Sequence, residues 1–594
     1  MRAWIDFPQS EDAPGRWRAR FTEPIQVLTA WKAGEVQDVL RQAQAHAEAG
    51  RWCLGAVAYE AAGAFDAALP THAPQPGWPL ARFAVFDRAL PWHEAQASAD
   101  GGQCTSWHFS MQRDTYARQL ERARDAMAAG ECYQVNLTGS LQAEFSGDVG
   151  QWMARLQAAQ PQAYLLWLDW GEQQVLSASP ELFFDWRPGS AGGALVCQPM
   201  KGTAARHAGA AEDERARQGL LASAKERAEN VMIVDLLRND LGRIAQPGSV
   251  RVPRLFEAQA LPTVWQMTST VTATTRPRTG LAEVFGALFP CGSVTGAPKG
   301  RAMHWIRELE DGPRGIYCGA AGVLRPGGHA TFNVPIRTVA LERMAAHGAP
   351  SWSARYGVGS GITHDATAQA EWQELAAKSR LPERTGQSLE LLETLRLEHG
   401  HYWLLEEHLA RMATSAAYFA FAWDRAQVEA LLQSLAREHS GGAWRIRLTL
   451  AASGKAGAQA FTLPATAEPV LFALSRQPLD TQAGNREFVL HKTTQREHYE
   501  TRLRPESGLF DTLLVNERGE LTEFTRGNIA LKLDGRWLTP ALRCGLLAGT
   551  YRGQLLARGE LVEAVLMPAD LERAEAVAFY NSVRGWLRAQ LSQC

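Results

Sequence analysis

One set of charged residues in the first two thirds of the chain has the spacing of a metal site. Glu371, Glu374 and Lys378 stand in QAEWQELAAK at i, i+3 and i+7, so on a helix they share one face. Glu229 stands near the start of an apolar helical pattern in AENVMIVDLLRND. Carboxylates from two helices, with few other protein ligands, suit Mg²⁺, which keeps waters and takes oxygen atoms from an anionic substrate. The same spacing also fits a solvated acidic face with an ion pair to Lys378.

Lys201 lies in PMKGT, between an apolar run and a glycine turn. Burial there would lower its pKa and leave a nucleophilic amine, although a single lysine in such a place is more often structural. Two loops rich in glycine, FPCGSVTGAPK (289–299) and YGVGSGI (356–362), have the composition of backbone anion sites or of ordinary capping loops. Neither fits a P-loop or a dinucleotide fingerprint.

A second set of residues has the chemistry that pyridoxal phosphate requires. Lys492 ends an apolar run, which we interpret as a strand, in HKTTQREHYE, and Glu523 and Asn528 follow in LTEFTRGNIAL. A lysine and a carboxylate for the pyridine nitrogen let that cofactor act as an electron sink. Gly549 and Thr550 open an expected helix in CGLLAGTYRG, where backbone N–H groups could bind a phosphate. A plain helix cap is the alternative.

The surrounding elements indicate a mixed α+β architecture. The strand-like runs AYLLWLDW and ALVCQPM alternate with helical stretches at about 111–130 and 211–241, and the composition of 208–216 is typical of a loop. Further on, WRIRLTLAAS and PVLFALSRQPL predict strands of a smaller α/β unit.

A helical pattern stops at a proline in SRLPERTGQS (379–388), and a new apolar run follows this polar stretch. We therefore place a domain boundary there. The predicted division is an N-terminal part of the first unit, its catalytic core, a linker and a second domain: 1–110, 111–380, 381–388 and 389–594.

The composition is that of a globular protein without membrane spans. Hydrophobic residues make up 46% of the 594 residues, mean hydropathy is −0.24, and no long uncharged apolar run occurs. The start, MRAWIDFPQS, does not resemble a signal peptide, so we expect a cytoplasmic protein. The formal charge of −2 shows no basic surplus and argues against nucleic acid as a partner. The eight cysteines form no CxxC pair and indicate reduced thiols.

Nine strings in order, from about 111 to 380, resemble the chorismate-utilising enzymes: GECYQVNLT, SPELFF, PMKGT, ENVMIVDLLRNDLGR, FPCGSVTGAPK, YCGAAG, FNVPIRT, YGVGSGI and AEWQELAAK. This family contains anthranilate, isochorismate and aminodeoxychorismate synthases. The resemblance implies a two-sheet sandwich with surrounding helices, and Mg²⁺ held by Glu229 and Glu374 with Glu371 close by. It assigns the binding of chorismate to Tyr317, Arg337, Gly359, Gly361, Thr295 and Gln266.

The third residue of PMKGT separates the branches of this family, because aminodeoxychorismate synthases carry Lys where the others usually carry Ala. By this resemblance Glu181 of SPELFF protonates the departing 4-hydroxyl while Lys201 adds at C2, and ammonia then adds at C4 and expels the lysine. Gln266 replaces the usual His and cannot act as an acid or base at neutral pH, which favours a synthase that stops at aminodeoxychorismate. Anthranilate or isochorismate synthesis is the alternative. No string resembles the cysteine elbow of a glutamine amidotransferase, so a separate glutaminase subunit is the expected source of ammonia.

The last third, from 389 to 591, resembles fold-type IV pyridoxal-phosphate enzymes, the class of branched-chain aminotransferase and aminodeoxychorismate lyase. The resemblance carries LLETLRLEHGHYWLLEEHLARM and the strings around Lys492, Glu523 and Gly549. It implies that Lys492 holds the cofactor and moves the C4 proton, that Arg411 binds the phosphate, and that Thr394 helps to protonate the departing enolpyruvyl group. Departures are Ala530, where an aromatic residue is common, and Trp537, where an aliphatic one is usual.

Together the two resemblances predict a bifunctional synthesis of 4-aminobenzoate from chorismate. The product of the first half, 4-amino-4-deoxychorismate, is the substrate of the second, which releases pyruvate. A second half that is an aminotransferase of other specificity, or a non-catalytic module, is the alternative. Because fold-type IV enzymes commonly dimerise, a homodimer is a further expectation.

Overall fold

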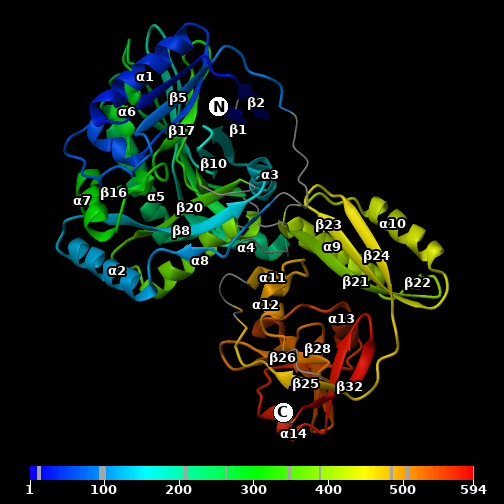
Figure 1. Ribbon diagram of the computed structural model, residues 1–594. Coiled ribbons are helices and arrows are strands. Elements are labelled where there is room, and N and C mark those ends of the chain that lie inside the picture. Colours follow the sequence, from blue (N-terminus) through cyan, green and yellow to red (C-terminus); the bar gives the residue numbers. More distant parts are fainter. Residues whose placement is uncertain are drawn as a thin grey trace. The chain divides into compact units, whose positions relative to one another are not determined.

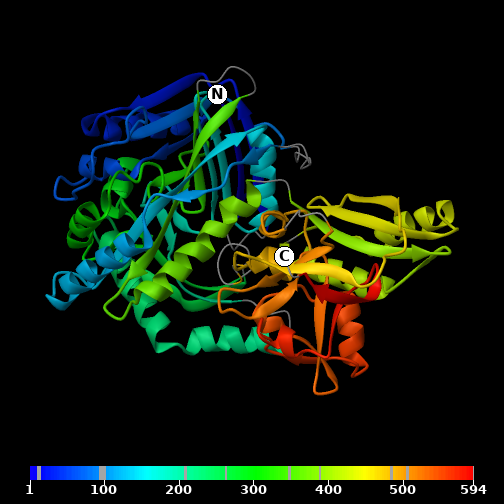
Figure 2. The same cartoon turned by 60° about the horizontal axis from the view of Figure 1, so that its bottom comes forward.

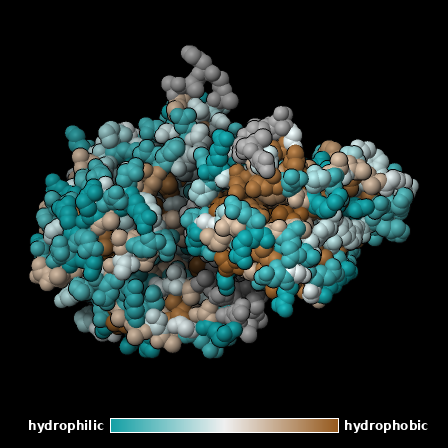
Figure 3. Space-filling view, turned by 90° about the horizontal axis from the view of Figure 1, so that it is seen from below, coloured by the Kyte–Doolittle hydropathy of each residue, from teal (hydrophilic) through white to brown (hydrophobic). Residues whose placement is uncertain are grey.

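The computed structural model describes residues 1–9, 15–92, 102–205, 210–260, 264–344, 350–386, 389–419, 421–479, 481, 486–503 and 508–592. The chain divides into two compact units, Met1–Gln96 with Asp100–Gln387, and Ser388–Cys594 (Figures 1 and 2). None of the described helices has the length and apolar character needed to cross a membrane. The face drawn in Figure 3 is largely hydrophilic, with apolar residues gathered in smaller areas.

The first unit contains two large, mainly antiparallel sheets. The strands of one sheet, in spatial order, are β16 (Gly296–Ala297), β8 (Gln134–Ser146), β20 (Ser351–Ile362), β19 (Thr338–Arg343), β10 (Gln173–Ser179), β9 (Tyr164–Asp169), β1 (Arg2–Pro8) and β2 (Arg16–Thr22), with β6 (Gln103–Cys104) and β7 (His108–Phe109) on β8. Those of the other are β13 (Met200–Ala205), β15 (Val264–Thr274), β12 (Ala194–Gln198), β11 (Leu182–Arg187), β18 (Ala330–Asn333), β17 (Ala320–Leu324), β4 (Trp52–Val57), β5 (Ala81–Phe86) and β3 (Gln26–Ala30), with β14 (Arg251–Ala260) on β15.

Helices cover the outer faces of the two sheets. They are α1 (Ala33–Glu48), α2 (Arg113–Ala128), α3 (Val149–Ala159), α4 (Ala210–Ala222), α5 (Ala224–Gly242), α6 (Leu281–Leu288), α7 (Lys299–Leu309) and α8 (Ala368–Thr385), with short 3₁₀ turns at Tyr59–Ala64 and Gly292–Val294. One core lies between the sheets, where Ile5 and Leu168 of the first sheet meet Leu54 and Val323 of the second. Two further cores join α1, α5 and α6 to the second sheet, and α2, α3, α7 and α8 to the first. This confirms the predicted α+β sandwich with surrounding helices.

Two helices run beyond the limits that their sequences indicate. α4 begins at Ala210, inside the stretch that we expected to be a loop, because alanine is the best helix former and outweighs the single glycine; 208 and 209 lie outside the described residues. α8 continues through Pro382 to Thr385, into the expected linker. Arg155 of α3 donates a 2.6 Å hydrogen bond to the Thr385 carbonyl, and Trp152 donates to its hydroxyl at 3.2 Å, which holds the last turn in place.

The second unit contains two sheets. The smaller consists of β22 (His401–Tyr402), β21 (Glu390–Glu398), β23 (Ala443–Ala451) and β24 (Ala456–Thr462), covered by α9 (Leu405–Phe419) and α10 (Arg425–Glu438) (Figure 1). The larger consists of β27 (Leu521–Phe524), β26 (Asp511–Val515), β25 (Val470–Leu474), β32 (Gly585–Leu591), β31 (Ala576–Asn581), β28 (Asn528–Leu533), β29 (Arg536–Pro540) and β30 (Val562–Ala564). The short helices are α11 (Arg486–Leu490), α12 (Glu497–Glu500), α13 (Thr550–Ala557) and α14 (Asp570–Arg573), with a 3₁₀ turn at Leu542–Cys544.

Two candidate active sites

A row of glycines on β20 opens one face of this strand. Gly357, Gly359 and Gly361 alternate along the strand and so face the same side of the sheet. A β-carbon at Gly357 would lie 2.2 Å from Cγ of Tyr317, and one at Gly361 would lie 2.5 Å from Nζ of Lys201. At Gly359 it would lie 2.5 Å from the Thr138 methyl group. The glycines therefore allow the tyrosine ring and the lysine amine to approach the backbone at the two ends of one row.

Lys201 lies on β13, with its amine among carboxylates. Burial lowers the pKa of Lys201, and the Glu229 carboxylate acts against that effect. Gln266 lies opposite Thr203 on β15, and its Nε2 donates a 2.9 Å hydrogen bond to the carbonyl of Gly202. The glutamine thus supports the backbone beside Lys201, a task that needs a donor and not a titrating group.

Glu181 is buried close to Lys201. Burial raises the pKa of Glu181 to about 7, although Ser293 and the Lys201 charge act to lower it. Its Oε1 atom has no hydrogen-bond partner among the described residues. A carboxyl group with a pKa near neutrality and one unpartnered oxygen can hold a proton and deliver it to a group placed beside it.

The 289–299 loop contributes a residue that the sequence did not single out. Ser293, and not Thr295, acts on Glu181, whose pKa it lowers. The Thr295 hydroxyl donates to the Cys291 carbonyl at 3.1 Å and is fully buried, and Thr295 is not among the residues that line the cavity beside Tyr317. The order of hydroxyl residues in GSVTG could not distinguish the two.

Four carboxylates from α5 and α8 influence one another. Burial raises the pKa of Glu226, Glu229 and Glu371, and the charge of Glu374 adds to the effect at each. Burial also raises the pKa of Glu374, but the charge of Lys378, 2.6 Å away, outweighs it and holds this pKa below its usual value. Glu226 was missed, although its i, i+3 spacing to Glu229 is the signal that would have found it.

This acidic group fits a divalent cation. Among the described residues no three acidic, His or Cys side chains converge closely enough to form a complete metal shell. Mg²⁺ needs only one or two protein carboxylates, since water and an anionic substrate supply its other oxygens. Burial is the main cause of the raised pKa of Glu229 and Glu371, and a cation there would offset it and the added repulsion from Glu374.

Tyr317 and Arg337 occupy different surroundings. Tyr317 lines a cavity of about 270 Å³ together with Gly357. Arg337 has a positive φ of 51°, and its guanidinium donates to the side chain of Gln160. The structure therefore places Tyr317 at the glycine row. Arg337 is instead bonded to the Gln160 side-chain amide, and a substrate carboxylate would have to displace this amide in order to bind Arg337.

In the second unit, one cavity of about 490 Å³ gathers every predicted residue. Its lining includes Thr394, Arg411, Lys492, Glu523, Asn528, Gly549 and Thr550. The predicted residues come from both sheets of this unit, from helix α9, from the segment after α11 and from the start of α13. Positions up to 156 residues apart in the chain, Thr394 to Thr550, thus share one cavity wall.

Lys492 follows the short helix α11, so the expectation that a strand precedes it is wrong. Its carbonyl accepts a 3.0 Å hydrogen bond from the Leu392 amide, which fixes the lysine beside β21. Burial and the Arg411 charge lower the pKa of Lys492 to about 8. A larger share of the amine is therefore uncharged near neutrality than in an exposed lysine.

Glu523 lies buried on β27 with its carboxylate held on several sides. Tyr499 donates a 2.7 Å hydrogen bond and the Leu547 amide a 3.0 Å hydrogen bond to Oε1, while the Asn528 amide is 3.4 Å from Oε2. Burial raises the pKa of Glu523 to about 7, although the hydrogen bonds from Tyr499 and Leu547 act to lower it. Such a carboxylate is suited to share a proton with a ring nitrogen.

Arg411 is oriented by residues that the sequence did not reveal. Two of its N–H groups donate to Glu393 at 2.8 and 2.7 Å, and a third donates to the Ala548 carbonyl at 3.0 Å. His408 lies 2.6 Å from the same carboxylate. Burial acts to raise the pKa of Glu393, but Arg411 and His408 outweigh it and hold the pKa well below its usual range.

The geometry at the start of α13 fits a phosphate. Among the described residues, three of the five N–H groups of Arg411 have partners, so two stay available in the cavity that Thr550 also lines. A β-carbon at Gly549 would lie 2.1 Å from Oδ1 of Asn528, so this position requires glycine. Together with a buried lysine and a buried carboxylate, these groups fit the phosphate, aldehyde and ring nitrogen of pyridoxal phosphate.

Residues 11–383 match the family of chorismate binding enzymes. The chain belongs to this family. Residues 390–591 match amino-transferase class IV, so the chain also carries a class IV aminotransferase domain. Both resemblances drawn from the sequence are thereby confirmed.

Curated relatives and a solved structure agree with this assignment. The chain is 38% identical over 290 residues to "Aminodeoxychorismate synthase component 1" of Klebsiella aerogenes, covering 48% of this chain and 61% of that protein. It is 37% identical to the Escherichia coli K12 protein of that name, covering 48% of this chain and 60% of that one. The chain thus spans about 60% of the length of these relatives. Anthranilate synthase component I from Streptococcus pneumoniae TIGR4, 24% identical, superposes with a TM-score of 0.54 over 64% of this chain and 94% of that one, which shows the fold.

In the chorismate binding enzyme unit, a buried ion pair holds the site loops together. Arg314 donates 2.7 Å hydrogen bonds to the carbonyls of Val294 and Asn136, and is paired at 2.6 Å with Glu310. Glu310 accepts a hydrogen bond from the Thr138 amide at 2.9 Å. Because Val294 follows Ser293, this pair joins the loop that carries Ser293 to β8, the strand that pairs with β20.

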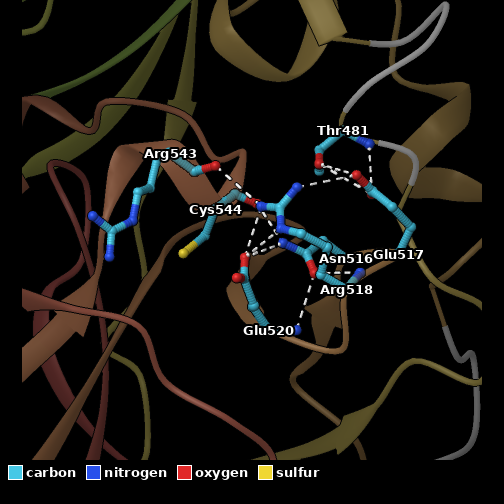
Figure 4. Close-up of polar contacts among 7 residues, drawn as sticks. All are labelled: Thr481, Asn516, Glu517, Arg518, Glu520, Arg543 and Cys544. Carbon is cyan, nitrogen blue, oxygen red and sulfur yellow. Dashed lines mark hydrogen bonds and ion pairs between the residues drawn. The ribbon is translucent and has the colours of Figure 1, made fainter. Parts of the chain in front are cut away.

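In the class IV aminotransferase unit, a polar network fixes the loop before α13 (Figure 4). Asn516 donates a 2.8 Å hydrogen bond to the Cys544 carbonyl, and Arg518 donates a 3.1 Å hydrogen bond to the Arg543 carbonyl. Arg518 also pairs with Glu520 at 2.7 Å. The chain continues from this anchored turn to Leu547, whose amide donates to Glu523. The β26–β27 hairpin that carries Glu523 thus also anchors the loop that donates to this acid.

Proposed function

We propose that this chain makes 4-aminobenzoate from chorismate in two steps. The first unit replaces the 4-hydroxyl of chorismate by an amino group, and the second removes pyruvate from the resulting 4-amino-4-deoxychorismate. The observation that carries the proposal is the placement of the Lys201 amine at Gly361, with the proton-holding Glu181 close by. The product of the first site is the compound that the second would consume.

In the first step, Lys201 forms a bond to C2 while Glu181 gives its proton to the 4-hydroxyl, which leaves as water. Ammonia then forms the C4–N bond, and the lysine leaves with the electron pair of its own bond to carbon. Two displacements with good leaving groups replace one difficult substitution. Bound Mg²⁺ would neutralise and orient the ring carboxylate. Glu229, Glu371 and Glu374 would hold it.

In the second step, Lys492 takes the proton from C4 and Thr394 helps to protonate the departing enolpyruvyl group. Pyridoxal phosphate, when bound, supplies the electron sink for this proton transfer. Glu523 keeps the ring nitrogen protonated, and Arg411 with the start of α13 holds the phosphate. Loss of pyruvate leaves an aromatic ring, which makes the step favourable.

The nitrogen source is a separate glutaminase subunit in this proposal. The curated relatives carry the words "component 1" in their names, which fits a second component. Purified chain should therefore aminate chorismate with ammonium salts and fail with glutamine. Amination of chorismate by the purified chain with glutamine alone would remove the need for that subunit.

Product analysis tests the two-step proposal. Purified protein receives chorismate, ammonium, Mg²⁺ and pyridoxal phosphate, beside Lys201→Ala and Lys492→Ala. The wild type should give 4-aminobenzoate and pyruvate, Lys492→Ala should stop at aminodeoxychorismate, and Lys201→Ala should give neither. Anthranilate or isochorismate from the wild type would contradict the assignment of the first unit. Transfer of amino groups between amino acids without pyruvate release would favour an aminotransferase of other specificity.

A further inference from the structure

Arg447 lines the second cavity and has no partner among the residues that the structure describes. It lies on β23 directly opposite Thr394 of β21, and both side chains line the cavity. Cross-strand partners of an antiparallel pair project from the same face, with β-carbons about 5 Å apart. Within the described part of the chain, no hydrogen bond or ion pair engages the Arg447 guanidinium. Its donors are therefore free for a ligand beside Thr394.

A second group of arginines lines the same cavity. Arg445, Arg526 and Arg584 all contribute to its wall. Burial lowers the pKa of Arg584, and the charges of Arg526 and Arg445 lower it further, which shows that the three cations crowd one another. Arg526 reaches Asp511 at 3.4 Å, which neutralises part of this charge.

The cavity wall has a large excess of positive charge. Its described lining contains six arginines and Lys492 against one acid, Glu523. Arg411 is neutralised by Glu393 and would serve the phosphate, and Glu523 would serve the ring nitrogen. Neither assignment uses Arg447 or the group of three, so these cations call for additional anionic groups on the ligand.

We propose that Arg447 binds one carboxylate of the substrate and that Arg445, Arg526 and Arg584 bind a second, which makes this cavity selective for cyclic amines with two carboxylates. The inference rests on the proposed function, because the expected product of the first unit is such a compound. A guanidinium and a carboxylate form two parallel hydrogen bonds, so Arg447 would also fix the ring beside Thr394. An amino acid with a single carboxylate would leave one arginine group unpaired, and the cavity discriminates against it for that reason.

The kinetic test uses the holoenzyme with bound pyridoxal phosphate and 4-amino-4-deoxychorismate as substrate. Arg447→Gln should raise KM for pyruvate release roughly 10- to 150-fold, with a smaller change in kcat, since charged hydrogen bonds contribute to binding on this scale. Arg447→Lys should recover part of the loss, because it restores the charge without the fork. Arg437→Gln, an exposed arginine of α10, is the matched control and should leave KM unchanged. A KM within twofold of the wild type, or loss of the cofactor's absorbance together with activity, would overturn the role of Arg447.

A binding test separates this inference from the proposed reaction. The absorbance of bound pyridoxal phosphate is titrated with isophthalate, a ring with carboxylates at positions 1 and 3, and with benzoate. The wild type should bind isophthalate at least 10-fold more tightly, and Arg447→Gln should lose that preference. This result would support the arginine assignment even if the wild type released no pyruvate from aminodeoxychorismate, an outcome that would end the proposed function alone. If the wild type bound isophthalate and benzoate equally well, the arginine assignment would be wrong, even if the protein released pyruvate from aminodeoxychorismate.

Discussion

Tyr499 donates a 2.7 Å hydrogen bond to Glu523, and this bond lowers the pKa of an acid that burial holds at about 7. Tyr499→Phe should therefore raise the pKa of Glu523 further. Since the carboxylate form is the one that supports a protonated ring nitrogen, pyruvate release should need a higher pH in the variant. The measurement is kcat/KM against pH for both proteins. An acid limb that does not move would show that Glu523 does not limit the reaction.

Glu181→Gln should abolish formation of aminodeoxychorismate while chorismate still binds. The amide cannot give a proton to the 4-hydroxyl, and such losses typically reach 10²- to 10⁴-fold. In the wild type the acid works in its protonated form, so amination at a fixed concentration of free ammonia should decline as pH rises through about 7. Product formation across pH checks both points, and a variant that retains a tenth of the activity would argue against Glu181 as the acid.

Gly361→Ala should stop the first reaction and spare the second. The new methyl group would lie 2.5 Å from Nζ of Lys201 and 2.2 Å from Nε2 of Gln134, so the lysine amine would have to move. Gly300→Ala is the control, because a β-carbon there meets nothing within 4 Å and stands in helix α7. The two activities are measured separately with chorismate and with aminodeoxychorismate. Equal amination by both variants would mean that Lys201 is not needed at this position.

Glu393→Gln should lower both the stability of the second unit and its affinity for pyridoxal phosphate. Removing one partner of a buried ion pair costs about 3 kcal/mol, and Arg411 would lose its orientation. Because the pKa of Glu393 is lowered by folding, its contribution is complete above the ordinary carboxyl range and is lost as pH falls towards its folded value. Thermal unfolding at pH 7 with and without pyridoxal phosphate measures both effects. Glu406→Gln, at an exposed glutamate of α9, the helix that carries Arg411, should change neither.

The sequence predicts the architecture of this chain better than the inner support of its sites. Strands such as β9, β12, β23 and β25 were predicted because apolar runs reveal them directly, and every residue predicted for the second site lines one cavity. Ser293, Glu393 and Tyr499 were missed, because each acts through a contact with a residue that short-range spacing does not relate to it. Roles for the predicted residues stay predictions until the variants above are measured.

The route of the chain between the two sites limits where the activities can be divided. Helix α8 carries Glu371, Glu374 and Lys378 and ends at Thr385, which α3 holds through Arg155. Strand β21 begins at Glu390, is bonded at once to Thr494, and bears Thr394 four residues later. If the two halves are expressed separately, the new terminus of each half must therefore lie within 386–389. A cut a few residues earlier would remove the last turn of a site-bearing helix, and one a few residues later would damage the first strand of the other half.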